Sequence, residues 1–213
     1  MKYKKVLYIA LTSIILVVVV FFIVRNNIFK NKHVSNFKVY EDDLDIVYGS
    51  DTAILNIFFY SSYNCSFCRK FLIEDFPELE KKYIHSGKVK FILKPIALTN
   101  NESIINSLKI AVCINEYGNF EKLNELLLEE PRVIYTDEFK NIVDEFVEKD
   151  EFIAECMYGG KSENYILTNL GSFKALGLTG TPAFIINNKI YKGYANFNEL
   201  SRIIDKEISY SLR

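Results

Sequence analysis

The clearest indication of the fold comes from residues 53–68, A-I-L-N-I-F-F-Y-S-S-Y-N-C-S-F-C. Residues 53–60 form a nearly continuous apolar run rich in β-branched and aromatic side chains. Turn-type residues follow the run, so a buried central strand is predicted. Apolar side chains then recur at helical spacing over 65–83, which predicts a helix with a kink at Pro77. The sequence therefore places Cys65 and Cys68 where a helix begins directly after a buried strand.

The segments on either side complete an α/β pattern. Residues 88–96 contain V-K-F-I-L and predict a second buried strand, parallel to the first across the helix. Strands return at 183–186 and 189–191, with Asn187 and Asn188 predicted to form a two-residue turn of the primed type. An amphipathic helix is predicted over 197–208.

The middle of the chain is helical in pattern. Residues 99–171 carry successive apolar faces at helical spacing and no convincing strand. No Gly-, Ser- or Pro-rich linker flanks this block, which is expected for an insertion into the α/β fold rather than for a separate domain on a tether.

The two cysteines after the strand have the spacing of a redox pair. One helical turn separates Cys65 from Cys68, which brings the sulfurs close enough to form a disulfide. The free N–H groups and the positive dipole end of a helix N-terminus favour a thiolate at the first position. We therefore expect Cys65 to be the exposed nucleophile and Cys68 to be the buried resolving thiol.

Two other interpretations of this motif remain open. The pair is also half of a zinc site, although none of the remaining candidates shows the paired spacing that such a site needs. Those candidates are Cys113, Cys156, His33 and His85. The second interpretation is two packed structural cysteines with no redox role.

A second signal lies far along the chain. Thr181 and Pro182 stand directly before the strand predicted at 183–186. A Thr–Pro bond at such a place can be cis and form a tight turn. Taken alone it is equally well an ordinary proline at the start of a strand, and it gains weight only from its combination with the cysteine pair.

Composition excludes several classes of protein. The 213 residues are 49% hydrophobic and 25% charged, with 26 basic and 27 acidic side chains and a formal net charge of −1. A disordered chain would be poorer in apolar residues, and a disulfide-stapled miniprotein would be richer in cysteine than four in 213. The even charge balance argues against a nucleic-acid binder.

The first 24 residues have the pattern of a membrane-targeting segment. Three lysines precede the uncharged stretch 6–24, which is long enough as a helix to span roughly 28 Å. A cleaved signal peptide and an uncleaved signal anchor both fit, and the anchor is favoured because no pair of small residues precedes Arg25. Residues 25–36 are predicted to be a polar linker.

These motifs resemble those of a known family. F-F-Y-S-S-Y-N-C-S-F-C-R-K-F at 58–71, followed by G-L-T-G-T-P-A-F-I-I-N-N-K-I-Y-K-G-Y at 177–194, is similar to the DsbA-like branch of the thioredoxin superfamily. These are bacterial extracytoplasmic thiol–disulfide oxidoreductases. The resemblance implies a thioredoxin-like core over 37–98 and 172–213 with an inserted helical domain over 99–171.

The resemblance also implies roles for particular residues. Cys65 matches the attacking cysteine of the family and Cys68 the resolving one. Thr181 and Pro182 match the cis-proline loop, which packs beside the disulfide and pairs with the substrate backbone. The resemblance implies no cofactor and no metal beyond the redox-active disulfide.

The sequence departs from the family at two places. The residues between the cysteines are Ser66 and Phe67, and neither is the histidine that strongly oxidising members carry there. Both residues are expected to belong, with the cis-proline loop, to the substrate-binding surface. No acid lies between Thr52 and Cys65, where the family has a buried carboxyl group. Proton transfer at Cys68 is therefore expected to use water or a lysine such as Lys94.

The other two cysteines, Cys113 and Cys156, fall in the predicted insertion. An oxidising compartment favours their pairing, and some DsbA-like relatives resemble this arrangement. A structural disulfide is therefore expected, the alternative being two buried small apolar side chains.

Together these observations predict a membrane-tethered enzyme that introduces disulfides into exported proteins. The resemblance implies a monomer at the periplasmic face of the bacterial inner membrane, recharged by a quinone-coupled membrane partner of the DsbB type. A disulfide isomerase or reductase of the same fold is the alternative within the class. The alternative outside it is a redox-inert anchored chaperone or metal-binding module.

Overall fold

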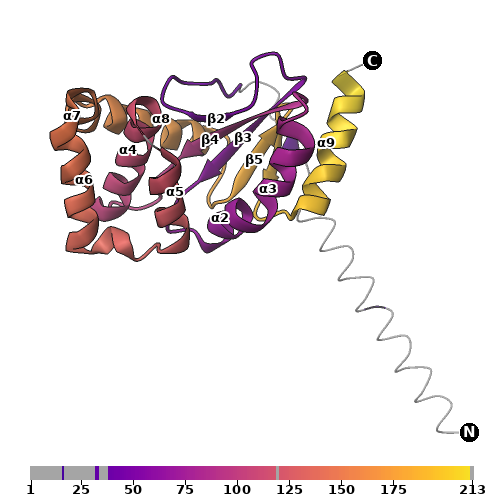
Figure 1. Cartoon of the computed structure of the whole chain (residues 1–213). Coiled ribbons are helices and arrows are strands. Elements are labelled where there is room, and N and C mark those ends of the chain that lie inside the picture. Colours follow the sequence, from indigo (N-terminus) through magenta and orange to yellow (C-terminus); the bar gives the residue numbers. More distant parts are fainter. Residues whose placement is uncertain (1–15, 17–31, 34–37, 119, 212–213) are drawn as a thin grey trace, which may run out of the picture. The chain divides into compact units, whose positions relative to one another are not determined.

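A twisted sheet organises the part of the chain that carries the cysteines (Figure 1). The computed structural model describes residues 16, 32–33, 38–118 and 120–211. It divides the chain into two units, Met1–Lys32 and His33–Arg213, and the short strand β1 (Lys32–His33) lies at their boundary. Among the described residues, none of the helices has the length and apolar character needed to cross a bilayer. The predicted anchor at 6–24, apart from Leu16, lies outside these residues, as does most of the linker at 25–36.

The sheet of the second unit has the strand order β6-β5-β3-β4-β2. The strands are β2 (Ile46–Tyr48), β3 (Leu55–Ser61), β4 (Val89–Pro95), β5 (Ala183–Ile186) and β6 (Lys189–Lys192). The two central strands, β3 and β4, are parallel as predicted, and β2, β5 and β6 pair antiparallel to their neighbours. The turn between β5 and β6 has positive φ at Asn187 (48°) and Asn188 (59°), which confirms the predicted primed turn.

The helix after β3 is continuous but changes its winding. It is made of α2 (Ser66–Lys70), the π-helical η1 (Phe71–Asp75), α3 (Phe76–Leu79) and the π-helical η2 (Glu80–Ile84). The irregularity falls where Pro77 removes a backbone donor, so the predicted kink takes the form of wider turns on both sides of the proline.

The remaining helices lie between β4 and β5 and after β6. They are α4 (Glu102–Tyr117), α5 (Phe120–Glu129), the 3₁₀ turn η3 (Val133–Tyr135), α6 (Asp137–Lys149), α7 (Glu151–Tyr158), α8 (Lys161–Ala175) and α9 (Phe197–Ser211). Figure 1 shows α4–α8 gathered on one side and α3 beside α9 on the other. The helical block predicted for 99–171 is thus present, but α8 runs through its predicted end. Gly171 sits inside α8, and the helix stops only before Gly177, whose φ of 66° terminates helices readily.

Alternating side chains of β3 fill the two faces of the sheet. Phe59 packs against Phe71, with ring centroids 4.9 Å apart, and against Phe184, at 4.8 Å. Tyr60 points to the other face and meets Phe173 of α8, with centroids 5.5 Å apart. Both β3 side chains are fully buried, so the strand that leads to Cys65 is held from both sides.

Candidate active site

The turn after β3 delivers Cys65 to the start of α2. The Cys65 N–H donates to the Ser62 carbonyl at 3.0 Å, and the Ser62 hydroxyl donates to the Asn64 side chain at 2.6 Å. Cys65 itself is the N-cap residue, with extended backbone (φ −89°, ψ 111°). Its sulfur accepts the Cys68 N–H at 3.2 Å, so a sulfur takes the place of the usual capping oxygen.

The cis-proline loop lies against this sulfur. The Thr181–Pro182 bond is cis, as predicted. The Cys65 thiol donates to the Thr181 carbonyl oxygen at 3.4 Å. This closeness follows from the sheet, because Ala183 at the start of β5 pairs with Tyr60 near the end of β3. Two segments that are far apart in the sequence therefore meet at one thiol.

The two thiols have opposite electrostatic environments. Hydrogen bonding from the Cys68 thiol, and further from the Thr181 side chain and the helix backbone, lowers the pKa of Cys65 to about 6 against the effect of partial burial. Cys68 has no exposed surface. Burial and the neighbouring Cys65 sulfur raise its pKa far above the ordinary value. The arrangement supplies one thiolate at neutral pH and one thiol that stays protonated.

An aromatic surface continues from the cysteine pair. Ser66 is exposed, Phe67 is 57% exposed, and the Phe67 ring lies 5.9 Å from the Tyr194 ring, centroid to centroid. The Tyr194 hydroxyl donates to the buried Asp75 carboxylate at 2.7 Å. Tyr194 was not among the residues predicted for the site; the only available signal was its place in the G-Y pair that follows β6.

The loop before Cys65 is tied to the helical insertion. The Tyr63 hydroxyl donates to the Asn124 side chain of α5 at 3.0 Å, and the Arg69 guanidinium donates to the Tyr63 carbonyl at 2.7 Å. Tyr63 is 6% exposed. No sequence pattern identified Asn124, because a single exposed-type amide within an amphipathic helix carries no local signal of its partner.

Lys94, one of the two expected routes for proton transfer at Cys68, lies in a buried ion pair. Its ammonium donates to both oxygens of Asp45, at 2.8 and 2.7 Å, and both side chains are nearly inaccessible to solvent. Tyr165 of α8 donates to the same carboxylate at 2.6 Å. Burial raises the pKa of Asp45, and these two partners oppose that rise. Lys94 of β4 is therefore held in a buried ion pair with the segment before β2, to which α8 adds the Tyr165 hydroxyl.

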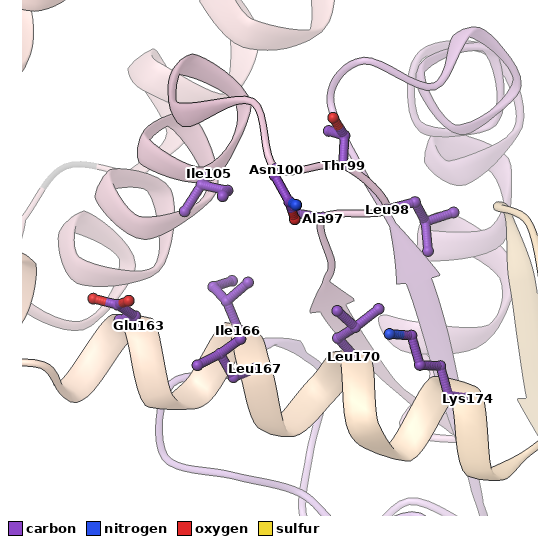
Figure 2. A pocket seen from close by; sticks show the side chains of 10 residues that line it. All are labelled: Ala97, Leu98, Thr99, Asn100, Ile105, Glu163, Ile166, Leu167, Leu170 and Lys174. Atoms are coloured by element: carbon purple, nitrogen blue, oxygen red, sulfur yellow. The ribbon is translucent and has the colours of Figure 1, made fainter.

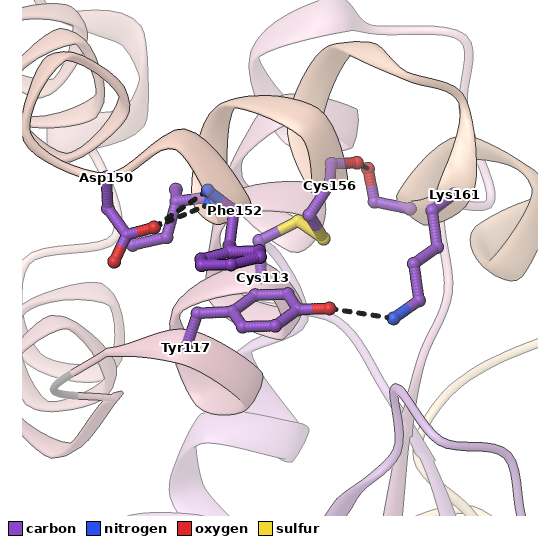
Figure 3. Close-up of a disulfide and its surroundings, with 8 residues drawn as sticks. Cys113, Tyr117, Asp150, Phe152, Cys156 and Lys161 are labelled. Carbon is purple, nitrogen blue, oxygen red and sulfur yellow. Dashed lines mark hydrogen bonds between the residues drawn. A yellow bond between two sulfur atoms is a disulfide. The ribbon is translucent and has the colours of Figure 1, made fainter.

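Cys113 and Cys156 are bonded to each other, with Cα atoms 5.7 Å apart (Figure 3). The bond joins α4 to α7. Beside it, the Tyr117 and Phe152 rings stack at 5.8 Å between centroids, and Lys161 donates to the Tyr117 hydroxyl at 3.0 Å. The structure thus separates one bonded pair within the insertion from one pair of free thiols at the start of α2.

Within the described ranges, no three side chains of His, Cys, Asp or Glu come together in a way that could hold a metal ion.

Comparison with known proteins identifies relatives of this chain. A family model described as thioredoxin matches residues 41–206. The chain is 25% identical over 179 residues to a Rickettsia conorii protein named "Putative protein-disulfide oxidoreductase", covering 81% of this chain and 62% of that one. It is 22% identical over 169 residues to disulfide bond formation protein D of Bacillus subtilis, covering 76% of each. The chain thus spans less than two thirds of the length of the first of these relatives.

Solved structures share the fold. The crystal structure of α-DsbA1 from Wolbachia pipientis superposes with a TM-score of 0.65 at 20% identity, over 79% of this chain and 92% of that one. The DsbA structure thus has the same fold as this chain, and the family match, which covers most of the chain, shows that the chain belongs to the thioredoxin family.

Proposed function

We propose that this protein is an extracytoplasmic thiol–disulfide oxidoreductase that introduces disulfides into exported proteins through Cys65 and Cys68. The observation that carries the proposal is the pair of free thiols at the start of α2, of which the first has its pKa lowered to about 6 beside the Thr181 carbonyl. The names of the Rickettsia conorii and Bacillus subtilis relatives support the same chemistry.

The reaction begins with the oxidised pair. A substrate thiolate attacks the Cys65 sulfur, so the Cys65–Cys68 bond breaks and a substrate–Cys65 mixed disulfide forms. Cys68 leaves with the electron pair and takes up a proton, which its raised pKa favours. A second substrate thiolate then attacks the substrate sulfur of the mixed disulfide, and Cys65 leaves as a thiolate. Two electrons have passed from substrate to protein, and the substrate holds a new disulfide.

The environment of Cys65 favours this direction. Lowering its pKa from 9.0 to about 6 stabilises the thiolate at pH 7 by at most about 1.4 kcal/mol. Solvent screening of this partly exposed sulfur makes the actual value smaller. For a two-electron couple this corresponds to at most about 30 mV toward a more oxidising pair. The effect is modest, which agrees with the absence of a histidine at Ser66 and Phe67.

Location and partners belong to the same proposal. The apolar stretch at 6–24 supports an anchor in the bacterial inner membrane. Basic residues flank this stretch on both sides, so the periplasmic side is proposed for the thioredoxin unit from the resemblance to the DsbA-like proteins. A reduced enzyme must pass two electrons on, and a quinone-coupled membrane protein of the DsbB type is the recharging partner that the resemblance suggests. We propose a monomer. Sequencing the N-terminus of the protein recovered from membranes tests the anchor, because a cleaved signal would leave a chain that starts after residue 24.

The activity is tested with the full chain in detergent and a reduced two-cysteine peptide. The oxidised protein should transfer one disulfide per molecule, Cys65→Ala should transfer none, and Cys68→Ala should accumulate a mixed disulfide with a peptide that carries one activated disulfide. Equilibration with glutathione then separates the alternatives. A reduction potential well above that of the glutathione pool supports the oxidase, and a thioredoxin-like potential supports a reductase. If the protein shows no turnover and Cys65 is unreactive, the proposal that it is an enzyme is rejected.

A further inference from the structure

An apolar pocket lies between the loop after β4 and the exposed face of α8 (Figure 2). It has a volume of about 200 Å³. Two leucines on its walls are unusually open to solvent: Leu98 is 48% exposed and Leu167 is 57% exposed. The other aliphatic lining residues are Ala97, Ile105, Ile166 and Leu170. This hollow is separate from the thiols and from the aromatic surface at Phe67.

The pocket lies at the same edge of the sheet as the reactive cysteine. The Ile96 N–H donates to the Ser61 carbonyl at 2.9 Å, so the end of β4, where the pocket begins, is bound to the end of β3. Ser61 is only four residues before Cys65. The path from Ala97 through Ile96 and Ser61 to Cys65 is therefore at most roughly 25 Å long, a distance that about seven extended residues cover.

Two charges of opposite sign mark the ends of the pocket. Figure 2 shows Glu163 at one end and Lys174 at the other, both on α8. At 1.5 Å per residue they are about 16 Å apart along the helix, the length of about five extended residues. Lys174 lies at the end of α8 that leads into Thr181 and Pro182, so the positive end is the one nearer the cis-proline loop.

We propose that this pocket is a second docking site for the reduced substrate polypeptide, one that binds aliphatic side chains of an extended segment carrying an acidic residue toward Lys174 and a basic residue toward Glu163. The inference rests on the proposed function and adds to it a substrate preference outside the immediate surroundings of the cysteines. A polypeptide is the fitting occupant because the lining between Glu163 and Lys174 is mostly aliphatic, and an extended chain can reach both of these opposite charges, about 16 Å apart along α8.

The test compares four reduced peptides with the same pair of cysteines, using the full chain. One peptide ends after the cysteines. The second continues through a seven-residue spacer to the segment Asp-Leu-Ser-Leu-Lys, the third replaces both leucines of that segment by serine, and the fourth replaces its aspartate by lysine. The wild type should oxidise the second peptide with a kcat/KM about tenfold above the first and the third, the order expected when half-exposed leucines lose contact with water. Its advantage over the fourth peptide, which keeps both leucines, should be smaller, about two- to fivefold, as expected for one exposed charge pair.

Protein variants identify the site. Leu98→Ser combined with Leu167→Ser should remove the preference without slowing the short peptide, since both side chains are already exposed. Ile54→Ser, a side chain of similar exposure (42%) at the opposite end of β3, should leave the preference intact. Lys174→Glu should reverse the order of the second and fourth peptides.

The outcomes separate the two proposals. If the wild type oxidises all four peptides at the same rate, the docking site is rejected and the proposed function stands. If it oxidises none, the proposed function fails and the docking site with it. If sedimentation shows a dimer of the wild type that the double leucine variant abolishes, a second copy of the chain covers the pocket, and the assignment to substrate is overturned.

Discussion

Replacing Cys68 by alanine is expected to raise the pKa of Cys65, because the Cys68 thiol is the largest single contributor that lowers it. A hydrogen bond to a charged group contributes about 1.5–3 kcal/mol. Its loss should therefore shift the pKa upward by about one to two units. The Cys68 N–H, 3.2 Å from the Cys65 sulfur, remains in the variant and keeps part of the effect.

Serine at the same position provides the matched control. Cys68→Ser keeps an O–H donor facing Cys65, so it should shift the pKa less than alanine does. Thr181→Val should also shift it less than Cys68→Ala, because the Thr181 side chain is a smaller contributor.

The pKa is measured from the pH dependence of alkylation by iodoacetamide. In both Cys68 variants Cys65 is the one free thiol among the three remaining cysteines, since Cys113 and Cys156 are bonded to each other. Equal titration curves for the alanine and serine variants, or an alanine variant that still titrates near pH 6, would refute the assignment of the Cys68 thiol as the main stabilising group.

Three further outcomes follow from the structure. Folding lowers the pKa of Cys65 from 9.0 to about 6, so its thiolate stabilises the reduced protein fully above pH 9, and this contribution is lost as the pH falls through 6. The urea midpoint of the reduced form should therefore rise relative to that of the oxidised form between pH 6 and 8. Parallel pH curves for the two forms would contradict this. Asp45→Asn should destabilise the protein by about 3–5 kcal/mol in urea denaturation, since it leaves the Lys94 ammonium buried without a counter-charge, and adding Lys94→Met should restore part of the loss. Replacing Cys113 and Cys156 by alanine should cost about 3–4 kcal/mol, the range for a closed loop of this size, while the alkylation of Cys65 stays unchanged; an altered alkylation rate would show that the two pairs are coupled.

Local features of the sequence were sufficient for most of the fold and for the two thiols. The buried strand ending at Ser61, the helix that starts at Cys65 and the turn at Asn187 and Asn188 each depend on residues that are neighbours in the chain. Pro182 was linked to Cys65 through the resemblance to the DsbA-like proteins, and the structure shows the physical cause, which is the antiparallel pairing of β5 with β3.

Contacts between distant side chains that belong to no recognised motif could not be predicted. Asp45 precedes a three-residue edge strand, and nothing near it indicates that its carboxylate will meet Lys94 and Tyr165 inside the protein. Tyr194 was missed in the same way, because its contact with Phe67 joins two segments that are far apart in the sequence.

The hydrogen bond from Tyr63 to Asn124 has a consequence for engineering the protein. It joins the loop that carries the nucleophile to a helix 61 positions further along the chain. A chimera that grafts residues 61–68 onto another scaffold without α5 would lose this brace, and the grafted loop would keep its cysteines without the anchor that orients them. The smallest transferable redox unit of this protein therefore includes part of its helical insertion.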